Sequence, residues 1–257
     1  EFTTLAALVW FDQAGGDWRI MEVGLGGRLD AVYVLEPDVA VLTNVGLDHQ
    51  KWLGETRAEI GLEKAHVFRQ GKPAILGRAD MPRSVRSHID AIGARPVDAS
   101  AQIVAADAGR WSWHGQYRVI EDLPAEMATH QRENFSAALS ALESVSAFSW
   151  DDEAVRRCAF AGLPPARQQR REAGDRHWVL DVAHNAGSIA ALASELERID
   201  APVTLVFGVM RDKPVEEMAA ILAPFIHRWI AVSVSQPRAL PATELARRLA
   251  AITGSPV

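Results

Sequence analysis

Two short apolar runs, each ending in polar residues, constrain the fold of this chain more than any other feature. Residues 18–23 predict a buried strand that carries Glu22 and runs into a Gly-Leu-Gly-Gly loop. Residues 39–42 predict a second strand, which stops at the sequence Thr-Asn-Val-Gly-Leu-Asp-His of residues 43–49. In open α/β sheets, ligands bind beyond the carboxyl ends of the strands. Two strands that both deliver polar groups there outline one site.

The side chains at these strand ends suit a hard divalent metal. Glu22 and His49 are ligands for Mg²⁺ or Mn²⁺ rather than for a structural zinc, and Asp48 is placed to orient the ring of His49. The glycines allow the backbone to approach a bulky anionic ligand closely. The alternatives are that Glu22 is an acid at a helix N-terminus and that His49 is structural. The coincidence of both with the glycines favours the metal.

Composition excludes several classes of function. The chain has 257 residues, a length that allows one large domain or two ordinary ones. Hydrophobic residues make up 48% of it, which is enough for a sizeable core. With 27 basic and 33 acidic residues the net charge is −6, which argues against nucleic-acid binding. No apolar stretch approaches the roughly 20 residues that span a bilayer, so we expect no membrane partner. The single Cys158 excludes an internal disulfide and favours the cytoplasm.

Strands that alternate with helices predict an α/β fold with mainly parallel sheets in two domains. We place the domains at residues 1–148 and 149–257, because Ser-Trp-Asp-Asp at 149–152 begins a new unit. Residues 1–13 predict a helix that packs on the first sheet. Residues 110–120 predict a hairpin whose aromatic side chains are packed rather than free for base stacking. We also expect a helix at residues 134–148 and a buried strand at 178–180.

Four stretches together carry a family resemblance: residues 22–30, Gly-Leu-Asp-His at 46–49, Glu-Lys-Ala at 63–65 and Asp-Val-Ala-His-Asn at 181–185. They resemble the motifs of the folylpolyglutamate synthase and dihydrofolate synthase family, within the Mur ligase superfamily of ATP-dependent amide-forming ligases. The resemblance runs through nearly the whole chain in the expected order. It implies a P-loop-type ATP- and Mg-binding domain, here truncated at its N-terminus. A smaller Rossmann-like domain, truncated at its C-terminus, would follow.

The resemblance assigns the metal site. Glu22 and His49 would bind divalent metal, with His49 on the second of two ions. Lys64 would be carbamylated by CO₂, although a lysine taken alone is usually a solvated surface residue. Carbamylation needs the neutral amine and therefore a pocket that lowers the lysine pKa. The carbamate would then help to hold the metal, so that Lys64 and His49 count among the catalytic residues.

The resemblance also assigns the nucleotide site. Asp181 and His184 match the family's pair that meets ATP from the second domain, and we count both as catalytic. Asn134 matches an asparagine that contacts the nucleotide, although it is equally suited to cap its helix. The Asp212-Lys213 pair is a weaker candidate for nucleotide or amino-acid binding, with a solvated charged turn as its alternative. The second domain would close over the nucleotide.

Three departures from the family pattern are visible. The usual Leu-Pro-Gly-Arg is Leu-Pro-Pro-Ala-Arg at residues 163–167, so the glycine is lost. Arg167 is the best match for the arginine that reaches ATP phosphates, with Arg170 and Arg171 as alternatives. The proline usual after Asn185 is Ala186, and Val-Tyr at residues 32–33 stands where an asparagine is usual.

The implied reaction joins L-glutamate to dihydropteroate or to a reduced folate. The acceptor's carboxylate attacks the γ-phosphate of ATP, and the amine of glutamate then displaces phosphate from the acyl phosphate. Mg²⁺ or Mn²⁺ would neutralise the developing charge. The chain contains no Gly-x-x-Gly-Lys-Ser/Thr pattern, which the family carries further upstream. We therefore expect these residues to be a monomeric excerpt of a longer protein, inactive and unstable by themselves.

Two other functions compete with this one. The chain resembles, less closely, other superfamily members that build peptidoglycan precursors. A non-catalytic binding protein that kept the fold is the second alternative, supported by the altered loop at 163–167. The joint presence of Glu22, His49, Lys64, Asp181 and His184 argues against loss of chemistry. A dinucleotide-binding reading is weak, because Gly-Leu-Gly-Gly lacks the third glycine at its required spacing.

Overall fold

The computed structural model describes residues 1–106, 109–125, 127–145, 149–161, 165–254 and 257. The chain forms two compact units, Glu1–Ala161 and Gly162–Val257. The division lies after the predicted boundary at 148/149, because helix α6 (Asp152–Phe160) belongs to the first unit. Val155 and Ala159 of α6 pack into one core with Trp111 and Trp113. This segment therefore stays with the aromatic sheet that covers it.

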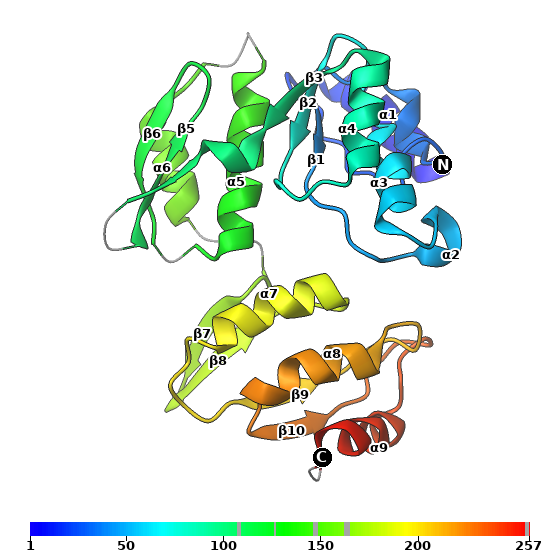
Figure 1. The fold of residues 1–257 in the computed structure, drawn as a ribbon, viewed down its shortest axis with the longest axis vertical. Helices are drawn as coiled ribbons and strands as arrows, with labels where there is room; N and C mark the ends of the chain where they lie inside the picture. The colour runs from blue at the N-terminus through cyan, green and yellow to red at the C-terminus, as the bar shows by residue number, and fades with distance from the viewer. Residues whose placement is uncertain (107–108, 126, 146–148, 162–164, 255–256) are drawn as a thin grey trace. The chain divides into compact units, whose positions relative to one another are not determined.

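A parallel sheet organises unit 1, in the order β1 (Ala40–Leu42), β2 (Pro73–Leu76) and β3 (Arg95–Asp98). Successive side chains of a strand face opposite sides, and β2 follows this rule. Ala74 and Leu76 pack with helices α3 (Arg57–Ala65) and α4 (Arg83–Ile92). Ile75 packs on the other side with Ala137 of α5 (Thr129–Glu143). Figure 1 shows α3 and α4 on one side of the sheet and α5 on the other.

The N-terminal segment differs from the predicted structure in the packing of its helix and in the absence of its strand. Helix α1 (Phe2–Ala14) forms as predicted, but none of its residues is buried and Trp10 is 63% exposed, so the predicted packing on the sheet is absent. Residues 18–23 form no strand, and Ile20 is 89% exposed. An apolar run becomes a strand only where a neighbouring edge supplies hydrogen bonds. Within the described residues β1 pairs only with β2. Two short helices follow, η1 (Ala31–Val34) and α2 (Gln50–Leu53).

A second sheet in unit 1 is antiparallel, with strands β4 (Ile103–Ala105), β5 (Trp111–His114) and β6 (Val119–Leu123) after helix η2 (Ala99–Gln102). The predicted hairpin is confirmed, since β5 pairs with β6. Trp111 and Trp113 are fully buried, and the indole nitrogen of Trp113 donates to Gln102 Oε1 at 2.9 Å. The prediction of packed aromatic side chains is therefore confirmed for the two tryptophans, but Tyr117 of the same stretch is 76% exposed.

Helix α5 begins at Thr129, five residues before the predicted start at 134. The backbone nitrogen of Ala128 donates to Gln131 Oε1 at 2.8 Å, so a glutamine side chain satisfies the helix end. Asn134 is consequently an exposed residue in the second turn and not the cap. Residues 146–148 of the predicted helix lie outside the described residues.

Unit 2 contains a parallel pair, β9 (Thr204–Phe207) and β10 (Arg228–Ala231). Its helices are α7 (Ala186–Leu196), α8 (Val215–Leu222), η4 (Ala223–Phe225) and α9 (Ala242–Thr253). The core joins both strands to the helices through, among others, Ile189, Met218, Trp229 and Leu249.

The remaining strands of unit 2, β7 (Gln169–Ala173) and β8 (Arg176–Leu180), form an antiparallel hairpin. The strand at 178–180 exists, but the prediction that it is buried was wrong, because every residue of β8 is exposed. Its apolar side chains belong to a two-stranded ribbon rather than to the core.

The class is α/β, as predicted, with a parallel sheet among the helices of each unit and an antiparallel sheet beside it. Among the described residues, no helix is long and apolar enough to cross a membrane.

Gly77 provides a test of the packing at the carboxyl end of the first sheet. A Cβ at this position would lie 2.5 Å from Thr43 O, and the backbone there cannot swing away as a side chain would. We expect Gly77→Ala to lower the stability of unit 1 by about 1–3 kcal/mol, measured by urea unfolding. Gly46→Ala is the matched control, since nothing lies within 4 Å of its Cβ position. Equal midpoints for the two variants would contradict the expectation.

Candidate functional site

The glycine loop after Glu22 is closed by one carboxylate. Asp30 Oδ2 accepts hydrogen bonds from the backbone nitrogens of Gly24 and Leu25, both at 3.0 Å. Asp30 Oδ1 accepts a third from Val32 N at 2.9 Å. The loop is therefore a compact turn held from within. Glu22 is exposed and is separated from the loop only by Val23.

The same loop rests on the backbone of α3. A Cβ at Gly27 would lie 2.3 Å from Glu63 O and 3.2 Å from Lys64 O, so only glycine fits. Lys64 is half-buried in the last turn of α3. The structure thus places the loop that follows Glu22 against the residue predicted to be carbamylated.

His49 occupies a special backbone position at the start of α2. Its φ of 53° is in the left-handed region, which non-glycine residues adopt only when the surroundings hold them there. Asp48 Oδ1 accepts a hydrogen bond from His49 N at 2.8 Å, but it lies 3.9 Å from Nε2 of the ring. Asp48 therefore fixes the backbone, and the expected carboxylate–ring hydrogen bond is not formed at that distance.

The donor types at these positions fit a divalent ion only as a partial ligand set. Among the described residues, no group of three His, Cys, Asp or Glu side chains could hold a metal. The side-chain types of Glu22 and His49 suit Mg²⁺ or Mn²⁺, which keep several waters and need few protein ligands.

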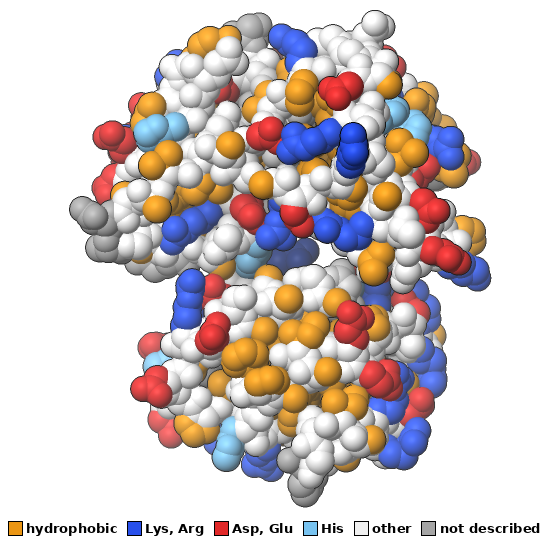
Figure 2. All heavy atoms as spheres, viewed as in Figure 1, with side chains coloured by type: hydrophobic (Ala, Val, Ile, Leu, Met, Phe, Trp, Pro, Cys, Tyr) orange, Lys and Arg blue, Asp and Glu red, His pale blue; other side chains and the backbone are white. Residues whose placement is uncertain are grey.

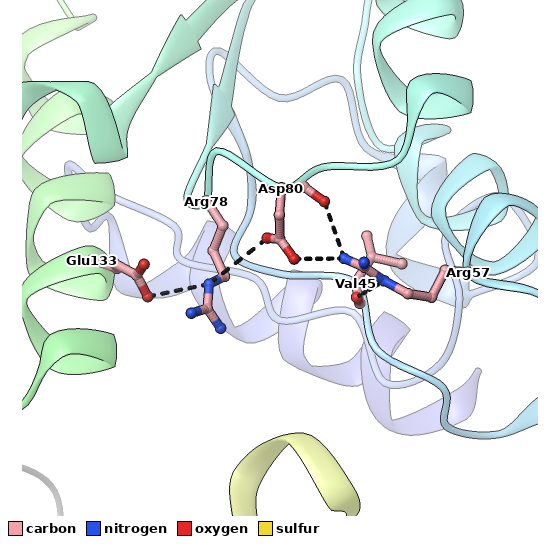
Figure 3. Close-up of polar contacts among 5 residues, drawn as sticks. All are labelled: Val45, Arg57, Arg78, Asp80 and Glu133. Carbon is pink, nitrogen blue, oxygen red and sulfur yellow. Dashed lines mark hydrogen bonds and ion pairs between the residues drawn. The ribbon is translucent and has the colours of Figure 1, made fainter. Parts of the chain in front are cut away.

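A polar network lies where β1 and β2 end (Figure 3). Arg57, the first residue of α3, donates from Nε to Val45 O at 2.9 Å and from Nη2 to Asp80 Oδ2 at 2.9 Å. Arg78 Nε lies 3.2 Å from Glu133 Oε2 and 3.9 Å from Asp80 Oδ1. The network ties the loops after both strands to α3 and to the second turn of α5.

The pKa of Glu133 is shifted by its place in this network. Burial raises the pKa of its carboxyl, and Arg78 offsets only part of that effect. Asn134 is the next residue and is exposed, so the Arg78–Glu133 pair holds the helical turn from which Asn134 projects.

Asp181 gathers two loops in unit 2. Its Oδ2 accepts from Gln168 N at 2.9 Å, before β7, and its Oδ1 accepts from Ala183 N at 2.7 Å, after β8. Arg167 directly precedes Gln168 and is exposed. Arg170 and Arg171 lie instead within β7, opposite Val179 and Trp178, and neighbouring strand residues point to opposite faces. Arg170 and Arg171 therefore point to opposite faces of the hairpin, whereas Arg167 lies in the loop before it. Leu163 and Pro164 lie outside the described residues.

His184 is held through its backbone and one ring nitrogen. Nδ1 lies 3.0 Å from Val182 O, which can only accept, so this hydrogen bond places a proton on Nδ1. The backbone nitrogen donates to Ser188 Oγ at 3.1 Å. Asn185 caps α7, with Oδ1 accepting from Ser188 N at 3.0 Å. Ala186 is the first helical residue, a position that alanine and proline both tolerate.

Asp212 and Lys213 follow β9, in the loop before α8. Asp212 is exposed, but the side chain of Lys213 is only 14% exposed, with Nζ 3.8 Å from Asp212 Oδ2. A solvated turn therefore describes Asp212 but not Lys213.

Acidic and basic side chains are interspersed on the face drawn in Figure 2, without a continuous basic patch. This agrees with the net charge of −6.

Sequence reasoning missed the residues that hold these loops: Arg28, Asp30, Arg57, Glu63, Arg78, Asp80 and Glu133. The sequence did contain one signal for these residues. Residues 78–80 follow the apolar run 72–77, and polar residues that follow a strand in an open α/β sheet are candidates for a site. Arg28 and Glu63 stand inside the quoted motifs, but only the fold brings them together, with Arg28 Nε 2.8 Å from Glu63 Oε2.

Comparison with known proteins identifies the chain. Residues 166–257 match the family model "Mur ligase, glutamate ligase domain". The dihydrofolate synthase/folylpolyglutamate synthase of Escherichia coli is 34% identical over 255 residues, which cover 97% of this chain and 59% of the relative. The chain belongs to this family. It spans about three-fifths of the length of the curated relatives it matches.

Solved structures of family members share the fold. Escherichia coli FolC in complex with DHPP and ADP has a TM-score of 0.87 at 32% identity, covering 96% of this chain and 59% of that one. The Yersinia pestis bifunctional folylpolyglutamate synthase/dihydrofolate synthase with AMPPNP and Mn has a TM-score of 0.85 at 36% identity, covering 96% and 60%.

Ala166 replaces the glycine of the family's Leu-Pro-Gly-Arg loop but has a backbone conformation that favours glycine. Ala166 stands before Arg167 with φ of 57°, in the left-handed region that favours glycine. A side chain there costs about 1–2 kcal/mol. The loop thus keeps a conformation suited to glycine without the residue.

We expect Ala166→Gly to raise the stability of unit 2 by about 0.5–1 kcal/mol, because relief of the left-handed strain exceeds the extra chain entropy of glycine. Ala190→Gly, exposed in the middle of α7, is the matched control and should lose about 1 kcal/mol. Thermal unfolding measures both. Destabilisation of unit 2 by Ala166→Gly would refute the strain.

Glu133 predicts a pH dependence. Its folded pKa is raised above the usual value near 4.5, so its contribution to stability is present below that pH and is lost as pH rises through the folded pKa. The stability of the wild type relative to Glu133→Gln should therefore be highest near pH 4 and fall towards pH 7. Arg78→Ala should extend the fall to higher pH, because Arg78 lowers this pKa. Urea midpoints across the range test both, and a flat difference would contradict the prediction.

Proposed function

We propose that this chain is part of an ATP-dependent ligase that adds L-glutamate to dihydropteroate, to folylpolyglutamates, or to both, through an acyl-phosphate intermediate. The observation that carries the proposal is the 34% identity to the Escherichia coli dihydrofolate synthase/folylpolyglutamate synthase over 97% of the chain. The match of residues 166–257 to a glutamate ligase domain supports glutamate as the incoming amine.

ATP and a divalent metal are the proposed cofactors. The Escherichia coli relative was solved with ADP and the Yersinia pestis relative with AMPPNP and Mn. In phosphoryl transfer of this kind, a metal neutralises charge on the transferred group. The carboxylate at Glu22 and the imidazole at His49 would hold it, with Lys64 as a carbamate. The contact between the glycine loop and the backbone of Lys64 supports this grouping.

Unit 2 would supply contacts to the nucleotide. Arg167 is the proposed phosphate ligand, since Asp181 ties the loop that carries it to the loop before His184. Nδ1 of His184 is engaged by Val182 O, so Nε2 is the ring nitrogen proposed to contact the ligand. Asn134 in unit 1 and the Asp212-Lys213 pair are further proposed contacts. The cytoplasm is the proposed compartment, given the single free Cys158.

The test is an assay of protein expressed from the complete gene. We expect phosphate release from ATP that depends on both L-glutamate and dihydropteroate or a reduced folate. Release that depends on a peptidoglycan precursor would assign another Mur-type ligase, and nucleotide binding without release in any mixture would assign a binding protein. The 257 residues alone should not ligate, because they contain no phosphate-binding Gly-x-x-Gly-Lys-Ser/Thr loop.

Carbamylation of Lys64 makes the sharpest prediction within this function. Lys64→Ala should lower kcat by about 10²–10³, the scale for loss of one charge-stabilising group. Depletion of CO₂ should lower the activity of the wild type, and bicarbonate should restore it. Lys51→Ala on α2 is the control and should keep wild-type activity. A wild type that ignores CO₂ depletion would remove the carbamate from the proposal.

A further inference from the structure

Glu63 is the only charged residue that is buried among those the structure describes. Its side chain is 11% exposed and pairs through Oε2 with Arg28 Nε at 2.8 Å, while the side chain of Arg28 is 55% exposed. The other carboxylate oxygen, Oε1, is buried and has no hydrogen-bond partner within the described part of the chain. The bond to Arg28 is therefore the interaction that compensates this buried charge.

The glycine loop is fitted around Glu63. A Cβ at Gly26 would lie 3.4 Å from Glu63 Cγ and 3.6 Å from Glu63 Oε1, and one at Gly27 would lie 2.3 Å from Glu63 O. Both the main chain and the side chain of Glu63 thus form the surface on which the loop closes. Asp30 holds the loop from within. Arg28 joins the loop to α3 through its ion pair with Glu63.

We propose that Arg28 and Glu63 are positioning residues that set the separation of Glu22 from Lys64. Only Val23 separates Glu22 from the loop, and Lys64 directly follows Glu63 on α3. Residues behind a ligand fix its place, and their loss weakens metal binding. Neither Arg28 nor Glu63 needs to touch the ion. The metal part of this inference rests on the proposed function, but the loop part does not.

Because Glu63 is buried and Arg28 is exposed, removal of Arg28 should have a different effect on the loop from removal of the charge of Glu63. Without Arg28, the Glu63 carboxylate stays buried and uncompensated, and opening the loop relieves it by admitting water. Without the charge, as in Glu63→Gln, that pressure is absent. The loop should therefore open more in Arg28→Ala than in the double variant Arg28→Ala/Glu63→Gln, an order that simple loss of packing does not produce.

Hydrogen exchange of the backbone amides of residues 24–28, in protein expressed from the complete gene, measures the opening. We expect Arg28→Ala to speed exchange about tenfold, the scale of one charge-assisted hydrogen bond. The double variant should exchange more slowly than Arg28→Ala. Arg19→Ala is the matched control, because Arg19 also pairs with a carboxylate, Asp12, just before the loop, and its exchange should equal that of the wild type.

Mn²⁺ binding, followed by electron paramagnetic resonance, tests the consequence for the ligands. Arg28→Ala should weaken Mn²⁺ affinity about tenfold, and Arg19→Ala should leave it unchanged. Unchanged loop exchange in Arg28→Ala, or a double variant that exchanges as fast, overturns the inference. A wild type that binds no Mn²⁺ overturns the metal site of the proposed function instead, and the exchange data still decide whether the pair holds the loop.

Discussion

The close approach of two backbones, at Gly27 and at residues 63–64 of α3, is the constraint on which the candidate metal site depends. No side chain fits between them, since a Cβ would lie 2.3 Å from Glu63 O. The position of the loop therefore follows the position of α3. That helix is fixed at its start, where Thr56 Oγ1 accepts from Glu59 N and Glu59 Oε2 accepts from Thr56 N. It is fixed along its length by buried side chains such as Ile60.

Helix α3 also reaches the other candidate loops, because Arg57 at its first turn binds Val45 O and Asp80. One end of the helix thus meets the loops after β1 and β2, and the other meets the glycine loop. A rigid element that contacts all three keeps their spacing, as a site with tolerances of about 0.5 Å requires. The ion pairs at its two ends differ in burial, so they differ in their contribution to stability. Glu63 is buried, whereas the partners of the Arg57–Asp80 pair are both largely exposed.

Sequence periodicity predicted the elements whose buried residues recur at regular spacing. It failed where contacts with other elements determine whether a segment forms a strand or is buried. The hairpin at residues 110–120 was predicted correctly, because Trp111 and Trp113 alternate with polar residues and are buried. Residues 18–23 and 178–180 are apolar runs typical of buried strands, yet none of these residues is buried, because burial depends on a covering layer that composition does not encode. The start of α5 was missed because Gln131, not a standard cap residue, closes it from inside the helix.

Motifs identified the candidate ligands, but not the residues that hold them, for a physical reason. Glu22, His49 and His184 are exposed and carry few structural duties, which leaves them recognisable only by resemblance. Their loops are shaped by Asp30 and Asp181, and each carboxylate accepts hydrogen bonds from backbone amides of two separate stretches. Charge-assisted bonds to amides are strong and independent of side-chain identity. The two units therefore reach the same solution, in which an acid fixes the loop and leaves the neighbouring side chains free to bind.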